Sequence, residues 1–347
     1  MKIGKAHISN THPCYIIAEA GVNHNGQLDL ALELVRRAKA TGADCVKFQT
    51  FKASTIVTPD APKANYQLEV TSRQESQFDM LKALELPMED YKKIIALCQE
   101  LDIQFLSTPY NIEDAAFLNK LNVDAFKIAS GQLVELPFLD YVARLGKPII
   151  ISSGMATLSE VFEGVQTIRA AGNEQIALLQ CTTNYPSRIE DTNLRAMVSM
   201  GQALDVLIGY SDHVANNYAC LGAVALGAKV IEKHFTLDTN MPGPDHSSSL
   251  DPNGFKELVY GIRQTELALG DPIKKPTAAE ITNTKGMRRS IVLNMDLPAG
   301  TVLEQKHLGF KRPATGIAPK RLHEVIGKKL SAAFPKDTIL NNKHIIW

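Results

Sequence analysis

Residues 15–51 read YIIAEAGVNHNGQLDLALELVRRAKATGADCVKFQTF and contain the unit from which the fold is built. Two β-rich apolar runs, 15–21 and 45–51, flank an amphipathic stretch at 28–42 that ends in a glycine suited to a left-handed helix cap. A strand, a helix and a second strand in this order form a parallel βαβ unit. The segment therefore predicts an α/β fold with a parallel sheet.

The same alternation continues to about residue 237. The predicted strands are 15–21, 45–51, 104–110, 125–131, 148–155, 176–186, 206–213 and 230–237. Eight such units are the number that closes a (β/α)8 TIM barrel. The alternative is a doubly wound open sheet, but its phosphate loop has the spacing GxGxxG after the first strand, which AEAGVNHNG lacks.

The composition changes after residue 270. Residues 271–284, rich in Pro, Thr and Lys, are predicted to be a linker between a barrel domain at 1–270 and a small β-rich domain at 285–347. The short predicted strands of this last part are separated by turn signals such as PAG and PKD. A domain of about sixty residues has a marginal core, so we expect it to pack on a barrel of its own chain or of a partner.

The composition restricts the classes of partner that we expect for this chain. The chain has 37 basic and 37 acidic residues, so it has no overall field to attract nucleic acid or an anionic membrane. The five scattered cysteines indicate buried thiols, and no stretch has the length of a signal peptide or membrane span. We expect a cytoplasmic protein with small-molecule substrates.

Polar side chains lie at the carboxyl ends of the predicted strands, where a βα barrel has its active site. The candidates are Glu19, Lys47, Gln49, Ser107, Thr108, Lys127, Ser130, Ser152, Ser153, Tyr185, Ser211, Asp212, His213, Glu232 and His234. Lys47 and Lys127 lie within apolar runs, so each requires an anionic partner from the protein or a ligand. Together with the hydroxyls they predict a phosphate pocket.

His213 and His234 end adjacent predicted strands and could direct two imidazoles at one divalent cation, with Asp245 or Glu19 supplying oxygen. The alternative is two separately hydrogen-bonded histidines.

These motifs resemble the sialic acid synthase family along the entire chain. The matching segments are AEAGVNHNG (18–26), VKFQTF (46–51), LSTPY (106–110), FKIASG (126–131), IISSGM (150–155), GYSDH (209–213), VIEKHFTLD (230–238) and GPDHSSSLDP (243–252). The C-terminal IVLNMDLPAGTVL and GFKRPATGI resemble the antifreeze-like (SAF) domain of these synthases.

The resemblance implies an enzyme that condenses phosphoenolpyruvate with an N-acetylated amino sugar. The expected acceptor is N-acetylmannosamine, giving N-acetylneuraminate and phosphate. The alternative is 2,4-diacetamido-2,4,6-trideoxymannose, giving N,N'-diacetyllegionaminate. It also implies a Mn²⁺ or Mg²⁺ cofactor and a homodimer in which the antifreeze-like domain of one subunit covers the barrel mouth of the other.

The resemblance assigns roles to individual residues. By likeness, the substrate anion contacts Lys47, Thr108, Lys127, Ser130, Ser152 and Ser211, and the metal binds His213 and His234. The sugar side is lined by Glu19, Gln49, Tyr185 and Asp245, with Arg312 reaching in from the neighbouring chain. We expect Glu19, Lys47, Lys127 and Asp245 to be catalytic, with Glu19 moving a proton.

Two positions depart from the family pattern. Gln132 stands where an acidic residue is common, and Thr183 replaces an asparagine found in some members. Residues 61–80 are expected to shape the acceptor pocket.

Two interpretations from other classes remain. A Schiff-base aldolase would use Lys47 or Lys127 as its amine, and a non-enzymatic protein would use its antifreeze-like domain to bind ice or polysaccharide.

Overall fold

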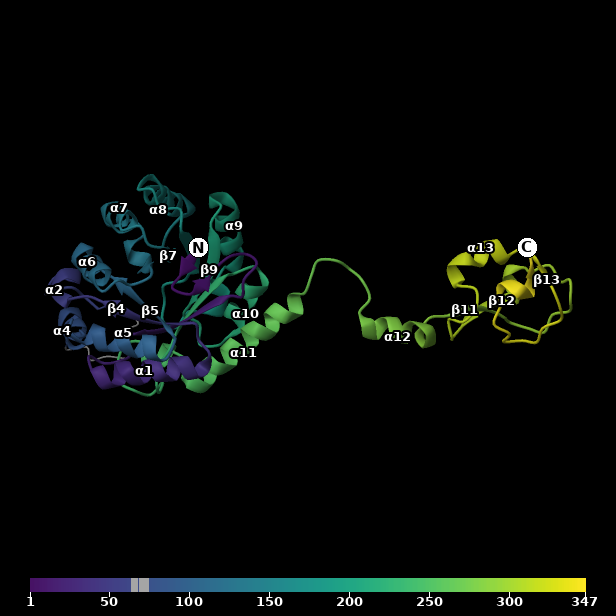
Figure 1. The fold of residues 1–347 in the computed structure, drawn as a ribbon, viewed down its shortest axis with the longest axis horizontal. Helices are drawn as coiled ribbons and strands as arrows, with labels where there is room; N and C mark the ends of the chain where they lie inside the picture. The colour runs from purple at the N-terminus through teal and green to yellow at the C-terminus, as the bar shows by residue number, and fades with distance from the viewer. Residues whose placement is uncertain (64–67, 69–74) are drawn as a thin grey trace. The chain divides into compact units, whose positions relative to one another are not determined.

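The computed structural model describes residues 1–63, 68 and 75–347 of the chain. The chain divides into two compact units, Met1–Gly270 and Asp271–Trp347 (Figure 1).

The first unit is built around an eight-stranded parallel sheet that curls into a barrel. Its strands are β3 (Tyr15–Gly21), β4 (Cys45–Thr50), β5 (Gln104–Pro109), β6 (Phe126–Ile128), β7 (Ile149–Ser152), β8 (Ile176–Cys181), β9 (Leu207–Asp212) and β10 (Val230–His234). Neighbouring strands follow one another in the sequence, and β10 pairs with β3, which joins the last strand to the first. The strands β5 and β6 at the two ends of this order lie side by side. The predicted TIM-barrel fold is confirmed.

Helices cover the outside of the sheet (Figure 1). They are α1 (Leu28–Thr41), α2 (Ala53–Ile56), α4 (Gln77–Ala83), α5 (Asp90–Glu100), α6 (Ile112–Lys120), α7 (Leu136–Arg144), α8 (Leu158–Ala170), α9 (Leu194–Leu204), α10 (Tyr218–Ala225) and α11 (Pro252–Leu269). Gly42 after α1 has a φ of 87°, so the predicted left-handed cap is confirmed, and Gly172, two residues after the end of α8, has a φ of 88°. Within the described ranges, no helix combines the length and apolar character needed to span a bilayer.

Strand alternation sorts the side chains into two layers. On β3, Ile16, Ala18 and Ala20 belong to the large core between the sheet and the helices. Tyr15 and Ile17 belong to a second core inside the barrel, at the amino-terminal ends of the strands. The next inward position on each strand lies one layer higher, toward the carboxyl ends, and there the residues become polar.

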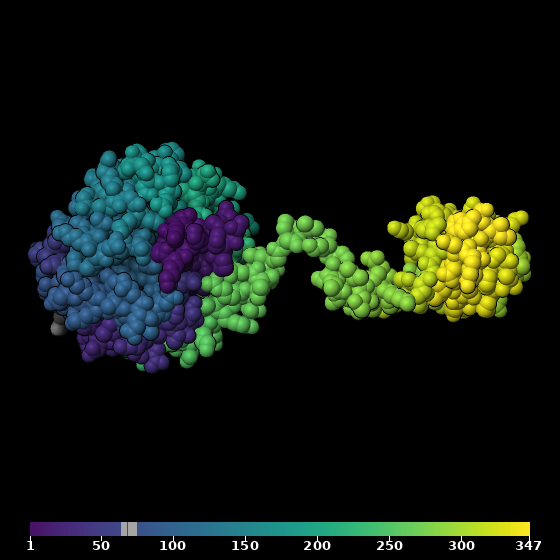
Figure 2. All heavy atoms as spheres, viewed as in Figure 1, coloured from purple at the N-terminus to yellow at the C-terminus, as the bar shows by residue number. Residues whose placement is uncertain are grey.

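A short hairpin that the sequence analysis did not predict closes the amino-terminal end of the barrel. Its strands are β1 (Lys2–Ile3) and β2 (Ala6–His7). Ile3 and Ile8 join the core inside the barrel, and the first residues are visible as the purple surface of the first unit in Figure 2. The interior of the barrel at this end is thus filled by apolar side chains.

The second unit has a small core of its own around Ile291, Leu303 and Leu340. Its strands are β11 (Ser290–Leu293), β12 (Leu308–Lys311), β13 (Lys329–Leu330) and β14 (Ile345–Ile346), with the short helix α13 (Leu322–Val325). A further helix, α12 (Ala278–Met287), begins inside the segment predicted as a linker. Its start is stabilised by a capping box between Thr277 and Glu280.

Candidate active site

The polar layer lines a cavity of about 200 Å³ at the carboxyl ends of the strands. Alternation predicts which side chains reach it, because positions two residues apart face the same side. The residues facing this cavity include Glu19, Lys47, Gln49, Thr108, Lys127, Ser130, Ser152, Cys181, Tyr185, Ser211, His213, Glu232 and His234. The cavity thus brings together every residue of the barrel to which the resemblance assigns a role except Asp245, which lies beside it. Of the other strand-end candidates, Ser107, Ser153 and Asp212 do not line it.

Two lysines and a glutamate form the deepest part of the cavity. The Nζ atom of Lys127 donates a hydrogen bond of 2.7 Å to Ser152 and lies 3.5 Å from Oε1 of Glu232. Lys47 lies 3.7 Å from Oε2 of the same glutamate and donates to the Thr108 hydroxyl at 3.1 Å. All five side chains are buried. Glu232 therefore acts as the shared counter-charge of both lysines.

The charges of this group are coupled. Burial favours the neutral form of Glu232, but the attraction of Lys127 and Lys47 outweighs it and holds the pKa of this carboxyl below its usual value. Burial lowers the pKa of Lys127 despite Glu232. For Lys47, burial is outweighed by Glu19 and Glu232, which raise its pKa. The cavity thus holds two ammonium groups prepared for an anion.

Glu19 lies at the other side of Lys47. Its Oε2 atom forms an ion pair of 2.8 Å with Lys47, and its Oε1 accepts a hydrogen bond of 3.2 Å from Gln49. Burial raises the pKa of Glu19 to about 7, against the lowering by Lys47. Two carboxyls in one cavity, Glu19 and Glu232, therefore have pKa values shifted in opposite directions, a pattern typical of a proton-transfer group beside a fixed charge.

Gly21 explains how these groups approach one another. Its φ of 53° lies in the left-handed region, and a Cβ atom there would lie 3.3 Å from both Glu19 and Gln49 and 3.6 Å from Asp245. Asp245 is nearly buried, and burial raises its pKa to about 6. The carboxyl of Asp245 thus adjoins the Glu19 side of the cavity.

His213 and His234 face each other, with ring centroids 5.3 Å apart. Nδ1 of His213 lies 2.7 Å from the carbonyl oxygen of Thr182, so this nitrogen carries a proton and Nε2 is the ring nitrogen that can bind an ion. Burial lowers the pKa of His234 well below its usual value, and nearby positive charges, among them Lys47 and Lys127, add to this effect. Tyr185 packs against His213 at a centroid distance of 4.0 Å.

The two imidazoles fit a divalent metal as a pair of ligands. Nδ1 of His234 is buried without a hydrogen-bond partner among the described residues and lies 3.8 Å from Oδ2 of Asp245. A buried nitrogen without a hydrogen-bond partner is explained if it binds an ion. Within the described part of the chain, no three His, Cys, Asp or Glu side chains converge on one point, so other ligands would complete the shell.

Gln132 and Thr183, the two departures from the family pattern, both line this cavity. Oε1 of Gln132 and Oγ1 of Thr183 are buried and have no hydrogen-bond partner among the residues described. Polar atoms left unpaired in a cavity are groups that a ligand can satisfy.

Two further predictions concern Arg312 and residues 61–80. Arg312 belongs to the second unit, where its Nε donates to the carbonyl of Met287 at 3.0 Å. Its contact with a neighbouring barrel stays a prediction. Of residues 61–80, predicted to shape the acceptor pocket, 64–67 and 69–74 lie outside the described residues.

The sequence analysis missed two residues of the cavity. Glu232 was named as a polar strand end but given no role, although an acidic residue in a run predicted as a buried strand is itself a signal. Cys181 was grouped with the buried thiols, yet its sulfur lies 3.9 Å from Nδ1 of His213.

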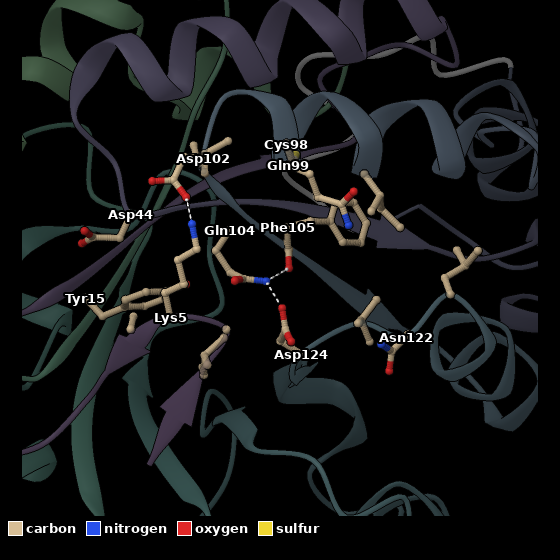
Figure 3. Close-up of a pocket in the computed structure, with 17 residues that line it drawn as sticks. Lys5, Tyr15, Asp44, Cys98, Gln99, Asp102, Gln104, Phe105, Asn122 and Asp124 are labelled. Atoms are coloured by element: carbon tan, nitrogen blue, oxygen red, sulfur yellow. Dashed lines mark hydrogen bonds and ion pairs between the residues drawn. The ribbon is translucent and has the colours of Figure 1, made fainter.

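A larger cavity of about 560 Å³ lies at the amino-terminal ends of the strands (Figure 3). Several of its polar side chains contact one another: Lys5 forms an ion pair with Asp102 at 2.7 Å, and Gln104 donates a hydrogen bond to Asp124 at 2.8 Å. Because barrels of this kind place their chemistry at the carboxyl ends, the smaller, polar cavity is the candidate active site.

Fold and cavity together define a TIM barrel whose lumen holds two buried lysines beside buried carboxylates. The model of the NeuB family matches residues 34–274, and that of the SAF domain matches residues 288–346. The chain belongs to the NeuB family of phosphoenolpyruvate-condensing nonulosonic acid synthases, and its C-terminal unit carries a SAF domain. The resemblance inferred from the motifs is confirmed.

Individual relatives cover nearly the whole chain. The N,N'-diacetyllegionaminic acid synthase of Campylobacter jejuni is 45% identical over 327 residues, which are 94% of this chain and 98% of that protein. The protein of the same name from Legionella pneumophila is 44% identical, covering 96% and 94%. The crystal structure of the spore coat polysaccharide biosynthesis protein spsE from Bacillus subtilis is 35% identical, with a TM-score of 0.68, and the match covers 100% of this chain and 99% of that one.

Proposed function

We propose that this protein condenses phosphoenolpyruvate with 2,4-diacetamido-2,4,6-trideoxymannose to give N,N'-diacetyllegionaminate and phosphate. The observation that carries the reaction is the buried pair Lys47 and Lys127, which both lie near Glu232 and face a cavity lined by hydroxyls, with Glu19 as a second partner of Lys47. The 44–45% identity to two N,N'-diacetyllegionaminic acid synthases supports the acceptor. It favours this sugar over N-acetylmannosamine, the first expectation from the motifs.

The lysine side of the cavity binds the phosphoenolpyruvate anion. Lys47 and Lys127 supply charge, and Thr108, Ser152 and Ser211 supply hydroxyl donors. Binding the dianion replaces the internal contacts with Glu232 by contacts with substrate. The cost of burying two ammonium groups is met before substrate arrives, because Glu232 already neutralises part of their charge.

The acceptor aldehyde belongs on the side of Glu19, His213 and His234. The C3 atom of phosphoenolpyruvate forms a bond to the aldehyde carbon, and the aldehyde oxygen takes a proton. Water then adds to C2, and the bond from C2 to the phosphate oxygen breaks to release phosphate. Glu19, whose pKa burial raises to about 7, is placed to move a proton at the aldehyde oxygen or the attacking water.

His213 and His234 would hold the divalent cation, Mn²⁺ or Mg²⁺. A bound cation supplies Lewis-acid polarisation of the aldehyde. Neutral His234 and the free Nε2 lone pair of His213 are the forms that bind such an ion. The homodimer, with Arg312 of the second unit acting at the partner's barrel, remains part of the proposal.

The test is phosphate release from phosphoenolpyruvate in the presence of Mn²⁺, with each acceptor sugar offered separately. We expect turnover that depends on the acceptor and a kcat/KM at least tenfold higher for the diacetamido sugar. A Lys127→Met variant purified in the same way controls for contaminating phosphatase. Phosphate release without acceptor, or none with either sugar, would contradict the proposal, and a preference for N-acetylmannosamine would contradict the acceptor alone.

The aldolase alternative makes a different prediction. An imine mechanism leaves a reduced adduct on Lys47 or Lys127 after treatment with pyruvate and borohydride. Because carboxylates pair with Lys47 and raise its pKa, this amine is held charged and is a poor nucleophile. We expect no adduct on either lysine by mass spectrometry, and an adduct on Lys127, whose pKa burial lowers, would favour the aldolase.

A further inference from the structure

A fully buried ion pair lies on the outer face of the barrel, behind the two histidines. Asp212 and Lys233 are directly opposite each other on β9 and β10, and both side chains are 0% exposed. Neither lines the candidate active site. Each immediately precedes a proposed metal ligand, His213 or His234, so alternation turns the pair outward while the imidazoles turn inward.

The pair is densely hydrogen-bonded. Nζ of Lys233 lies 2.6 Å from Oδ2 of Asp212 and also donates to the carbonyl oxygens of Val214 and, at 3.0 Å, Asn216. Oδ1 of Asp212 accepts from the Tyr210 hydroxyl at 2.9 Å and from the Val214 amide at 3.0 Å. The ammonium group therefore uses all three of its donors.

These contacts hold the loop that carries His213. Residues 213–217 connect β9 to α10, and the carbonyls of Val214 and Asn216 belong to neither element. Lys233 binds both of them from the neighbouring strand, so the backbone after His213 is tied to the backbone before His234. On its other side, the His213 carbonyl accepts from the Ser187 amide at 2.8 Å.

A buried ion pair is seldom the most stabilising way to fill such a space, because apolar side chains avoid the cost of removing two charges from water. A fixed separation between two metal ligands, in contrast, requires a directional link between their strands. The Asp212–Lys233 pair provides such a link, and it does so one residue away from each ligand.

We propose that Asp212 and Lys233 are positioning residues that set the separation of the His213 and His234 imidazoles and thereby the affinity for the divalent cation. This inference rests on the proposed metal site. The pair touches neither substrate nor cation. Its effect is transmitted through the backbone of the β9–α10 loop.

The test measures Mn²⁺ affinity by the electron paramagnetic resonance signal of free Mn²⁺, with phosphoenolpyruvate present and no acceptor, so that no turnover occurs. We expect Lys233→Met, and the charge-balanced double variant Asp212→Asn with Lys233→Met, to weaken Mn²⁺ binding at least tenfold in the folded protein. Tyr210→Phe removes a single hydroxyl from Asp212 and should weaken it about threefold. This mild variant decides the question if both lysine variants fail to fold.

The matched control is Arg263→Met. Arg263 on α11 pairs with Asp44 at 3.1 Å at the opposite end of the barrel, so its loss should lower the unfolding temperature and leave Mn²⁺ affinity unchanged. Wild-type affinity in the folded variants of Tyr210 and Lys233 would overturn the inference. Absence of Mn²⁺ binding by the wild-type protein would instead overturn the proposed metal site.

Discussion

Replacing Lys127 by methionine tests the anion site most sharply. The side chain is 2% exposed, donates to Ser152 at 2.7 Å and lies 3.5 Å from Glu232. At an effective dielectric constant of about 20, a charge pair at this distance attracts by about 5 kcal/mol. Burying the ammonium costs several kcal/mol, so the two terms nearly cancel in the substrate-free protein. We therefore expect the stability of the variant to change by only about 1–2 kcal/mol.

The attraction between Lys127 and Glu232 and the cost of burying the ammonium group cancel only for stability. The loss of Lys127 affects substrate binding in full. A phosphoenolpyruvate dianion in the Lys127→Met variant loses a buried charged partner, which costs about 3–4 kcal/mol. At about 1.4 kcal/mol per factor of ten, the KM for phosphoenolpyruvate should rise about 100- to 1000-fold. The KM for the acceptor sugar should stay within about threefold.

The assay is phosphate release at saturating acceptor and varied phosphoenolpyruvate, with thermal unfolding as a check of the fold. Lys93→Met makes the same substitution at an exposed lysine paired with Asp90 on α5 and should leave both constants unchanged. A KM for phosphoenolpyruvate within about threefold of the Lys93→Met value would refute the assignment of Lys127 to the anion.

Four further changes test other parts of the site. Because burial raises the pKa of Glu19 to about 7, kcat/KM should rise as the pH increases through about 7. Glu19→Gln should lower kcat by about 10²–10⁴ and abolish this rise with pH. A variant that still showed the rise would exclude Glu19 as its source. Burial lowers the pKa of His24 to about 4, so as the pH falls below about 6.5 this histidine takes up a proton in the unfolded chain before it does so in the folded protein. The free energy of unfolding of the first unit should therefore drop by about 3 kcal/mol toward pH 4. Urea unfolding of His24→Gln should show a smaller drop. Gln132→Leu removes the buried, unpaired amide oxygen and should lower kcat/KM for the diacetamido sugar more than tenfold. Equal efficiencies would remove this residue from acceptor recognition. If Arg312 acts on the neighbouring barrel, a mixture of Arg312→Ala and Lys127→Met chains should recover part of the activity that each lacks, whereas no recovery after subunit exchange would argue against action in trans.

Much of the barrel could be predicted from the sequence because its strands carry two periodic signals. Apolar runs placed all eight strands, but several observed strands are shorter than predicted: β7 ends at Ser152 and not at residue 155, and β8 ends at Cys181 and not at residue 186. Strand alternation then predicts that Lys47 and Lys127 face the same lumen, which the structure shows. Which side chains each lysine contacts depends on how the sheet closes, and the distances between strands far apart in the sequence cannot be read from the sequence.

The contacts of Glu232 illustrate this limit. It is 185 residues from Lys47 and 105 from Lys127 in the chain, and it meets both only because β10 returns beside β3. The same limit applies to its outward neighbour Lys233. Nothing in VIEKHF shows that this ammonium group binds two carbonyls of the loop after the neighbouring strand. A charged residue in an apolar run indicates that it has a partner in the fold, but it does not identify that partner.

Short elements escaped prediction for a different reason. The hairpin β1–β2 has two residues per strand, too few for a period to be detected. Helix α12 was hidden by the Pro and Lys residues before it, although Thr277 and Glu280 have the spacing of a capping box and could have marked its start.

The most direct test of the account is a single turnover with phosphoenolpyruvate labelled with oxygen-18 in the bridging position, the diacetamido sugar and Mn²⁺, followed by phosphorus NMR and mass spectrometry of the product. The account predicts that the label appears in the released phosphate and that the product carries a new bond between C3 of phosphoenolpyruvate and the sugar aldehyde carbon. Label retained at C2 of the product, or phosphate released without this bond, would contradict it.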